Sequence, residues 1–171
     1  MDCADRYQWL LAIRQRWGDG LGGKVLQRLL ELAFHESGYR IVEERMSEGI
    51  DFDVEHREPP HDRYSFEART TASLLVAVKN EDLRQMDERM RDGYHAGLAA
   101  LHIGPGTGWV FMERLWLLPP SVRISLGTSA CWQGLADRIN REFDSVLEYL
   151  GPTARDRGLV GLTPSINQAR R

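Results

Sequence analysis

The sequence contains little cysteine, no paired cysteine motif and no long hydrophobic run. Its two cysteines, Cys3 and Cys131, stand far apart and indicate neither a disulfide framework nor a zinc site. The five histidines are scattered without metal-binding spacing. No apolar stretch approaches the length of a membrane span, and the N-terminus lacks the pattern of a signal peptide. Together these absences predict a cytoplasmic protein without a membrane partner.

Lysine is also scarce. It occurs only as Lys24 and Lys79, so every other basic side chain is arginine. Arginine suits bidentate contacts with phosphate, but a base composition that favours arginine codons explains the bias equally well. The net charge of −3 is unlike that of a strong nonspecific nucleic-acid binder. Acidic residues concentrate between Glu43 and Glu67, where nine of them stand against three arginines.

At 171 residues, the chain is long enough for one domain with a proper core. We expect this domain to span residues 1–150. Gly151 and Pro152 are typical of a helix end, so residues 151–171 are expected to form an irregular or partly disordered tail. The order of elements predicts an α/β domain whose mixed central sheet is flanked by helices on both faces. Four helices are expected: over 4–17, from the end of the DGLGG loop to Gly38, over 80–91 with Asn80 as N-cap, and over 129–150. Besides a central hairpin, strands are expected over 39–45, 74–78, 96–103, 109–118 and 121–126.

The stretch from Ser47 to Thr71 predicts that hairpin. Its arms, SEGIDFDV and YSFEARTT, alternate as half-buried strands do, around a loop whose two prolines suit a connection. Asp51 and Asp53 fall on one face of the first arm, and Glu67 and Arg69 share a face of the second. A hairpin symmetric about the second proline would set Asp53 across from Glu67 and Asp51 across from Arg69.

Carboxylates gathered in this way repel each other, so they need protons, a basic partner or a divalent cation. The pattern therefore has two interpretations. One is a metal site on this face of the sheet. The other is a salt bridge between Asp51 and Arg69 on a solvated face, with no metal involved.

The same stretch resembles the PD-(D/E)xK nuclease superfamily, and within it the Mrr-type restriction endonucleases and the related archaeal Holliday-junction resolvases. The resemblance covers roughly residues 22–110 and includes the strand and helix that follow the hairpin, VAVKNEDLRQM and then AGLAALHI. It implies a restriction-endonuclease-like core. It rests on an amphipathic helix ending at Gly38-Tyr39, a strand, the turn EGID, the triplet Glu67-Ala68-Arg69 and the polar residues Thr70 and Thr71.

This resemblance also implies a set of functional residues. In the family, an aspartate after a Gly-Gly-[Ile/Val] or similar turn binds metal, which corresponds to Asp51 after Gly49-Ile50. A Glu/Gln-x-Lys triplet on the next strand completes the site, so Glu67 and the carbonyl of Ala68 would bind Mg²⁺ or Mn²⁺ with Asp51. The implied activity is metal-dependent endonucleolytic cleavage of DNA, in defence or DNA processing.

Two positions depart from the family's pattern. Arg69 stands in place of the triplet's lysine; it can stabilise the phosphate but hardly deprotonate a water, because its pKa stays above about 12. Lys79, at the end of the neighbouring strand, is the lysine expected to compensate, with a metal-held hydroxide as the other candidate base. Gln27 stands where the core helix often carries a metal-assisting glutamate. Glu31, one turn along the helix, could substitute for it.

These departures leave another class of function open. The chain could be a catalytically degenerate nuclease-fold module that binds nucleic acid or a partner protein. Its charged side chains would then form salt bridges, for example Asp53 with Arg57. An unrelated α/β enzyme is the third alternative.

The C-terminal half is rich in aromatic residues. The segment from Trp109 to Leu150 holds three of the five tryptophans. Trp132 and Phe143 fit a core helix, whereas Trp116 lies in WLLPP, where an exposed apolar cluster is typical of a contact surface. Cutting both strands of a duplex usually needs two active sites, and most soluble oligomers are symmetric dimers. We therefore expect a homodimer, or a partner protein, bound through this half.

Overall fold

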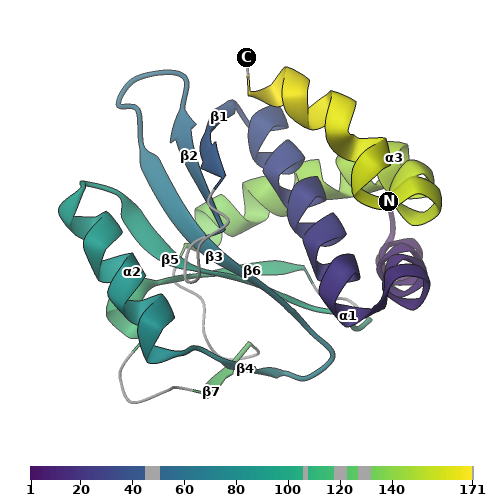
Figure 1. Cartoon of the computed structure of the whole chain (residues 1–171), viewed down its shortest axis with the longest axis horizontal. Helices are drawn as coiled ribbons and strands as arrows, with labels where there is room; N and C mark the ends of the chain where they lie inside the picture. The colour runs from purple at the N-terminus through teal and green to yellow at the C-terminus, as the bar shows by residue number, and fades with distance from the viewer. Residues whose placement is uncertain (45–50, 106–107, 118–122, 127–131, 171) are drawn as a thin grey trace.

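The computed structural model describes residues 1–44, 51–105, 108–117, 123–126 and 132–170. Parts of four expected strands and helices, and the turn residues Gly49-Ile50, lie outside these ranges. Figure 1 shows the arrangement of the elements. In chain order they are α1 (Cys3–Glu36), β1 (Tyr39–Glu44), β2 (Phe52–His56), β3 (Arg63–Thr71), β4 (Leu75–Ala77), α2 (Asn80–Arg91), β5 (His95–His102), β6 (Trp109–Glu113), a 3₁₀ turn (Arg114–Trp116), β7 (Arg123–Ser125) and α3 (Gln133–Ala169).

The central sheet has five strands in the order β1-β2-β3-β5-β6. β3 and β5 run parallel and the other neighbours run antiparallel, so the sheet is mixed. The helices α1 and α3 cover one face of the sheet and α2 covers the other (Figure 1). This confirms the predicted mixed α/β architecture with helices on both faces.

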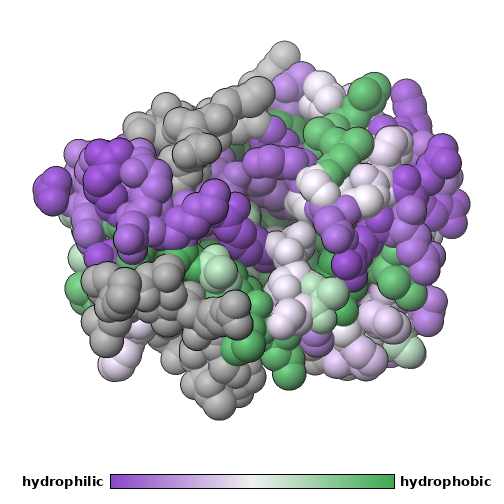
Figure 2. All heavy atoms as spheres, turned by 60° about the horizontal axis from the view of Figure 1, so that its bottom comes forward, coloured by the Kyte–Doolittle hydropathy of each residue, from purple (hydrophilic) through white to green (hydrophobic). Residues whose placement is uncertain are grey.

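Alternation along the strands divides the core into two layers. The larger layer lies under α1 and α3, where Phe34 contacts the rings of Phe52, Phe66 and Phe111 at centroid distances of 5.5–5.7 Å. The smaller layer lies under α2 and includes Met86. The outer face of α2 is hydrophilic (Figure 2), as an amphipathic helix on a sheet requires. The polar residues of the hairpin belong to the face under α2.

The first helix breaks where expected but resumes earlier. Gly18 has φ = 73°, a backbone conformation that glycine adopts without the steric cost of a Cβ. Residues 19–23, expected to be a loop, are helical and begin the second segment of α1. This segment, which carries Lys24, Gln27 and Glu31, lies against the end of β3.

The C-terminal segment is not the irregular tail expected for residues 151–171. Residues through Ala169 belong to α3, because tertiary packing against α1 outweighs the helix-stopping tendency of Gly151 and Pro152. A Cβ on Gly151 would lie 3.2 Å from the Trp9 ring, so the missing side chain allows a close helix contact. In the described part of the chain, no helix combines the length and apolarity needed to cross a membrane.

Two strands differ from expectation. The segment expected as a buried strand over 74–78 pairs with β7 in a separate two-stranded sheet, and Leu74 is 53% exposed. β6 ends at Glu113 and gives way to the 3₁₀ turn, which leaves Trp116 72% exposed while Leu117 is buried. The exposed Trp116 is compatible with the expected contact surface. The interface itself stays a prediction.

Candidate active site

Asp51 stands directly before β2, where this strand meets β3. Its backbone N–H donates to the carbonyl of Phe66 at 2.9 Å, and the loop closes with the N–H of His56 donating to the carbonyl of Asp62 at 2.9 Å. This closure moves the hairpin register by two residues from the one expected. Continued by one residue, the observed register sets Asp51 beside Glu67, not opposite the arginine two positions later.

Asp53 does not join these carboxylates. It pairs across the strands with Ser65, not with Glu67. Its fully buried carboxylate forms an ion pair with Arg89 of α2. The alternative pairing of Asp53 with Arg57 is also wrong, because the Arg57 guanidinium contacts a histidine of α1. This buried ion pair connects α2 to the sheet. Of the three carboxylates predicted to lie together, Asp51 and Glu67 therefore remain neighbours and Asp53 does not.

The carboxylate of Asp51 is held from two sides. Lys24 Nζ of α1 lies 2.9 Å from Oδ1, and the backbone N–H of Ala68 donates to Oδ2 at 2.8 Å. Lys24 Nζ also lies 3.4 Å from Oε1 of Gln27. Each Asp51 oxygen accepts one of these hydrogen bonds and retains a second lone pair. The carboxylate is therefore oriented and still able to bind a cation.

Glu67 is 3% exposed and lies close to a guanidinium. Arg69 Nη2 is 2.5 Å from Glu67 Oε1, and the same nitrogen donates to Oδ2 of Asp82 at 3.1 Å. Burial raises the pKa of Glu67 to about 8, the charge of Asp51 adds to the increase, and Arg69 opposes it. The interpretation as a salt bridge between Asp51 and Arg69 is wrong. Asp51 pairs with Lys24, and Arg69 pairs with Glu67 and Asp82.

Lys79 lies at the start of α2 with an exposed side chain. It is the N-cap residue, one position before the expected cap Asn80. Its backbone N–H donates to Oδ2 of Asp82 at 3.0 Å, so this carboxylate caps α2 and holds Arg69 at once. The lysine ammonium that the structure brings to the carboxylates is that of Lys24.

Gln27 and Glu31 follow Lys24 on the same helix but have different roles. Gln27 Nε2 donates to Glu31 Oε1 at 3.1 Å, and Arg28 Nη1 lies 2.7 Å from Glu31 Oε2. Glu31 is fully buried, and burial raises its pKa. Both oxygens of Glu31 are thus engaged within α1, whereas Gln27 reaches the site beside Lys24. Glu31 does not line the cavity that opens between α1 and β3.

A cavity of about 210 Å³ opens between α1 and β3 at these residues. Within the described ranges, no group of three or more His, Cys, Asp or Glu side chains is placed to hold a metal ion. Mg²⁺, however, is often held by one or two carboxylates together with waters and substrate phosphates. A site for such an ion would need no more than the two carboxylates Asp51 and Glu67, of which Asp51 lines the cavity. The cavity is lined by Asp19, Gly20, Gly23, Lys24, Gln27, Asp51, Ala68, Arg69 and Thr70.

Sequence reasoning missed two residues of this site. Lys24 precedes Gln27 by three positions, a spacing that puts both on one helix face, and this pattern could have identified it. Asp82 at the third position of α2 is a typical capping residue, but its contact with Arg69 depends on how α2 packs on the sheet. Comparison with known proteins gave no match, either to a protein-family model or to a curated protein.

Proposed function

We propose that this chain is a metal-dependent nuclease that hydrolyses phosphodiester bonds of DNA at Asp51 and Glu67, with Mg²⁺ or Mn²⁺ as cofactor. The observation that carries the proposal is a pair of buried carboxylates beside a cavity, with one lysine and one arginine in contact with them. A buried carboxyl group with a raised pKa, as in Glu67, is typical of functional sites. A divalent cation would offset the repulsion between them.

The arrangement of elements supports the same proposal. Along the chain, the elements α1, β1, the hairpin β2–β3, β4, α2 and β5 follow the order of the PD-(D/E)xK core that the sequence resembles. Asp51 directly precedes β2, and Glu67 lies in β3, an order that agrees with the resemblance. A restriction-endonuclease-like core is therefore part of this proposal.

The side chains divide the chemistry between them. When bound, Mg²⁺ would lower the pKa of a coordinated water and offset the charge that builds on the phosphate. Arg69 stays charged and would stabilise the phosphate oxygens in the transition state. Lys24 is the lysine beside Asp51, so it is the candidate to orient or deprotonate the attacking water. Asp82 is a positioning residue, because its Oδ2 accepts hydrogen bonds both from Arg69 and from the backbone N–H of Lys79 at the start of α2.

The acidic character of the site is compatible with a polyanionic substrate. The net charge of −3 and the paired carboxylates repel DNA until a cation is bound. Glu67, with its raised pKa, can retain a proton until the cation displaces it. Binding of metal and binding of substrate are expected to be coupled for this reason.

The test is cleavage of end-labelled DNA by purified protein with Mg²⁺ and with EDTA. We expect metal-dependent cleavage that falls on the order of 10²-fold or more in Asp51→Ala and in Glu67→Ala. Glu58→Ala is the matched control, since it removes an exposed carboxylate from the loop of the same hairpin. Equal residual cleavage by the unaltered protein and Asp51→Ala would indicate a contaminant and overturn the proposal.

One observation favours a second candidate function. The ion pair between Arg69 and Glu67 already neutralises a carboxylate that a metal would otherwise bind. In a catalytically degenerate module, this pair would be permanent, and the fold would bind nucleic acid or a partner protein. DNA binding without cleavage at any Mg²⁺ or Mn²⁺ concentration would support that function.

A further inference from the structure

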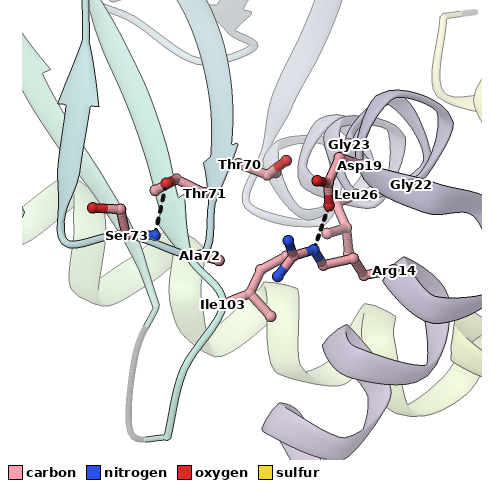
Figure 3. A pocket seen from close by; sticks show the side chains of 10 residues that line it. All are labelled: Arg14, Asp19, Gly22, Gly23, Leu26, Thr70, Thr71, Ala72, Ser73 and Ile103. Carbon is pink, nitrogen blue, oxygen red and sulfur yellow. Dashed lines mark hydrogen bonds and ion pairs between the residues drawn. The ribbon is translucent and has the colours of Figure 1, made fainter.

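A larger cavity, of about 320 Å³, adjoins the candidate active site at the end of β3 (Figure 3). It shares Asp19, Gly23 and Thr70 with the smaller cavity at Asp51. The two cavities therefore follow one another along the seam between α1 and β3. A nucleic-acid strand bound at Asp51 and Glu67 would continue directly into the larger cavity.

Polar groups line one side of this cavity. Hydroxyl groups are supplied by Thr70, Thr71 and Ser73, and a guanidinium by Arg14. Thr71 Oγ1 accepts a hydrogen bond from the backbone N–H of Ser73 at 2.9 Å, which fixes the hydroxyl at the turn after β3. Figure 3 shows Arg14 reaching from α1 toward this turn. A cation next to several hydroxyl donors is suited to binding a phosphate.

Aliphatic groups line the rest of the cavity. Leu26, Ala72 and Ile103 form this part, and both Leu26 and Ile103 are buried. The volume is at the lower end of the range for small-molecule sites, so the cavity can take one nucleotide unit and not a base pair. A phosphate-binding side and an aliphatic side together match the phosphate and sugar of a nucleotide.

A glycine of α1 keeps the cavity in contact with the active site. A Cβ on Gly23, which lines both cavities, would lie 3.0 Å from Thr70 Oγ1. A side chain at this position would crowd the seam where the two cavities meet. The DGLGG segment, helical in the structure, therefore brings α1 close to β3 without filling the space between them.

Without a ligand, the guanidinium of Arg14 already forms an ion pair. Its Nε lies 2.5 Å from Oδ1 of Asp19, an exposed carboxylate at the junction of the two cavities. A phosphate and Asp19 must then compete for the same guanidinium. This competition predicts that loss of Arg14 lowers the affinity for the phosphate and that loss of the Asp19 carboxylate raises it.

We propose that this cavity binds an unpaired nucleotide next to the scissile phosphate, with Arg14 contacting its phosphate and Asp19 limiting the affinity. The inference rests on the proposed nuclease function and narrows its substrate to DNA with unpaired nucleotides at the cleavage site, such as a single strand or an overhang. Blunt duplex offers no unpaired nucleotide to the cavity and should bind more weakly.

The test measures binding and does not require cleavage. A labelled single-stranded oligonucleotide is titrated with Glu67→Gln protein in EDTA by fluorescence anisotropy, over a series of salt concentrations. This variant has no ionisable group at position 67, and EDTA excludes metal, so cleavage does not complicate the measurement of binding. Arg14→Gln, Arg14→Lys and Asp19→Asn are then introduced, and Arg16→Gln is the matched control, since Arg16 is exposed on the same helix and stacks on Trp17 outside the cavity.

We expect Arg14→Gln to weaken binding several-fold and to reduce the slope of log K against log salt by about 0.7, the value for one phosphate contact to a single strand. Arg14→Lys should retain the slope, Asp19→Asn should bind several-fold more tightly, and Arg16→Gln should be unchanged. The Arg14–Asp19 pair is at the surface, so these variants should lose no more than about 1 kcal/mol of stability.

Three results would overturn the inference. They are no binding of the single strand, equal effects of Arg14→Gln and Arg16→Gln, and blunt duplex bound as tightly as the single strand. The nuclease proposal has a separate outcome. If the protein binds a single strand through Arg14 but shows no metal-dependent cleavage, the binding site is retained and the nuclease proposal is rejected. If cleavage depends on Asp51 but is unaffected by Arg14→Gln, the nuclease proposal is retained and the binding site is rejected.

Discussion

The ammonium group of Lys24 lies 2.9 Å from Oδ1 of Asp51 and connects α1 to the start of β2. One of the two lysines in the chain is thus placed on a candidate metal ligand, while the lysine position of the triplet is occupied by Arg69. Lysine can release a proton at accessible pH and arginine cannot. The site therefore has an ammonium group on α1 and a guanidinium that stays charged on β3.

The first prediction concerns this lysine. Lys24→Ala should lower the single-turnover cleavage rate on the order of 10²-fold, as loss of a proton-transfer group does, and Lys24→Arg should not restore it. Because Lys24 is 59% exposed, its ion pair should contribute less than about 1 kcal/mol to stability. Lys79→Ala is the matched control and should retain the rate. Loss of activity in Lys79→Ala, but not in Lys24→Ala, would return the role to the residue expected from sequence.

The second prediction concerns Arg69, which is within 2.5 Å of Glu67 and 3.1 Å of Asp82. Above pH 8, where Glu67 is largely ionised, Arg69→Ala leaves two buried carboxylates without this cation; because Arg69 itself is 36% exposed, the free energy of unfolding should fall by no more than about 3 kcal/mol. Arg69→Lys retains the charge and should keep most of the stability, with a cleavage rate that is equal or higher. Urea unfolding and single-turnover cleavage measure the two effects. An unchanged stability of Arg69→Ala would show that solvent already screens both carboxylates.

The third prediction follows from the raised pKa of Glu67. Between pH 4.5 and about 8 the folded protein holds a proton that the unfolded chain has lost, so the contribution of Glu67 to stability falls as pH rises through this window. Glu67→Gln should reduce the dependence of stability on pH and make the metal-free protein more stable near the upper end of this pH window. Urea unfolding in EDTA across the window tests this. A Glu67→Gln profile parallel to that of the unaltered protein would contradict it.

The fourth prediction concerns self-association. Trp116 is 72% exposed at the turn after β6, and the neighbouring Leu115 is also exposed. If the chain forms a dimer through this cluster, Trp116→Ser should convert it to a monomer, because large aromatic side chains dominate interface energies. Tyr149→Ser removes a similarly exposed aromatic side chain from α3 and is the control. A monomeric mass for the unaltered protein by light scattering at micromolar concentration would contradict the prediction.

Much of the hairpin could be predicted from local pattern. The alternation of Phe52, Val54 and Phe66 with charged residues assigned each side chain to the correct face, because a strand has a fixed period of two. The register could not be predicted in the same way. It depends on where the loop closes, and this is set by the hydrogen bond between His56 and Asp62, two residues away from the symmetric position.

The rest of the site depended on contacts between distant segments. Lys24 meets Asp51 only because the second segment of α1 begins at once after Gly18 and lies along β3. Similarly, Gly151 and Pro152 suggest a helix end by themselves, yet the following segment packs on α1 near Trp17. Neither contact has a local pattern in the sequence, so tertiary packing decides both.

The central claim is that Asp51 and Glu67 together bind a divalent cation. Anomalous diffraction from crystals soaked in Mn²⁺ above pH 8, where Glu67 is largely ionised, tests this most directly. We predict a peak between the two carboxylates that is lost in Glu67→Gln crystals soaked in the same way. A saturating soak that leaves Asp51 paired with Lys24, Glu67 paired with Arg69 and no peak between them would contradict the account.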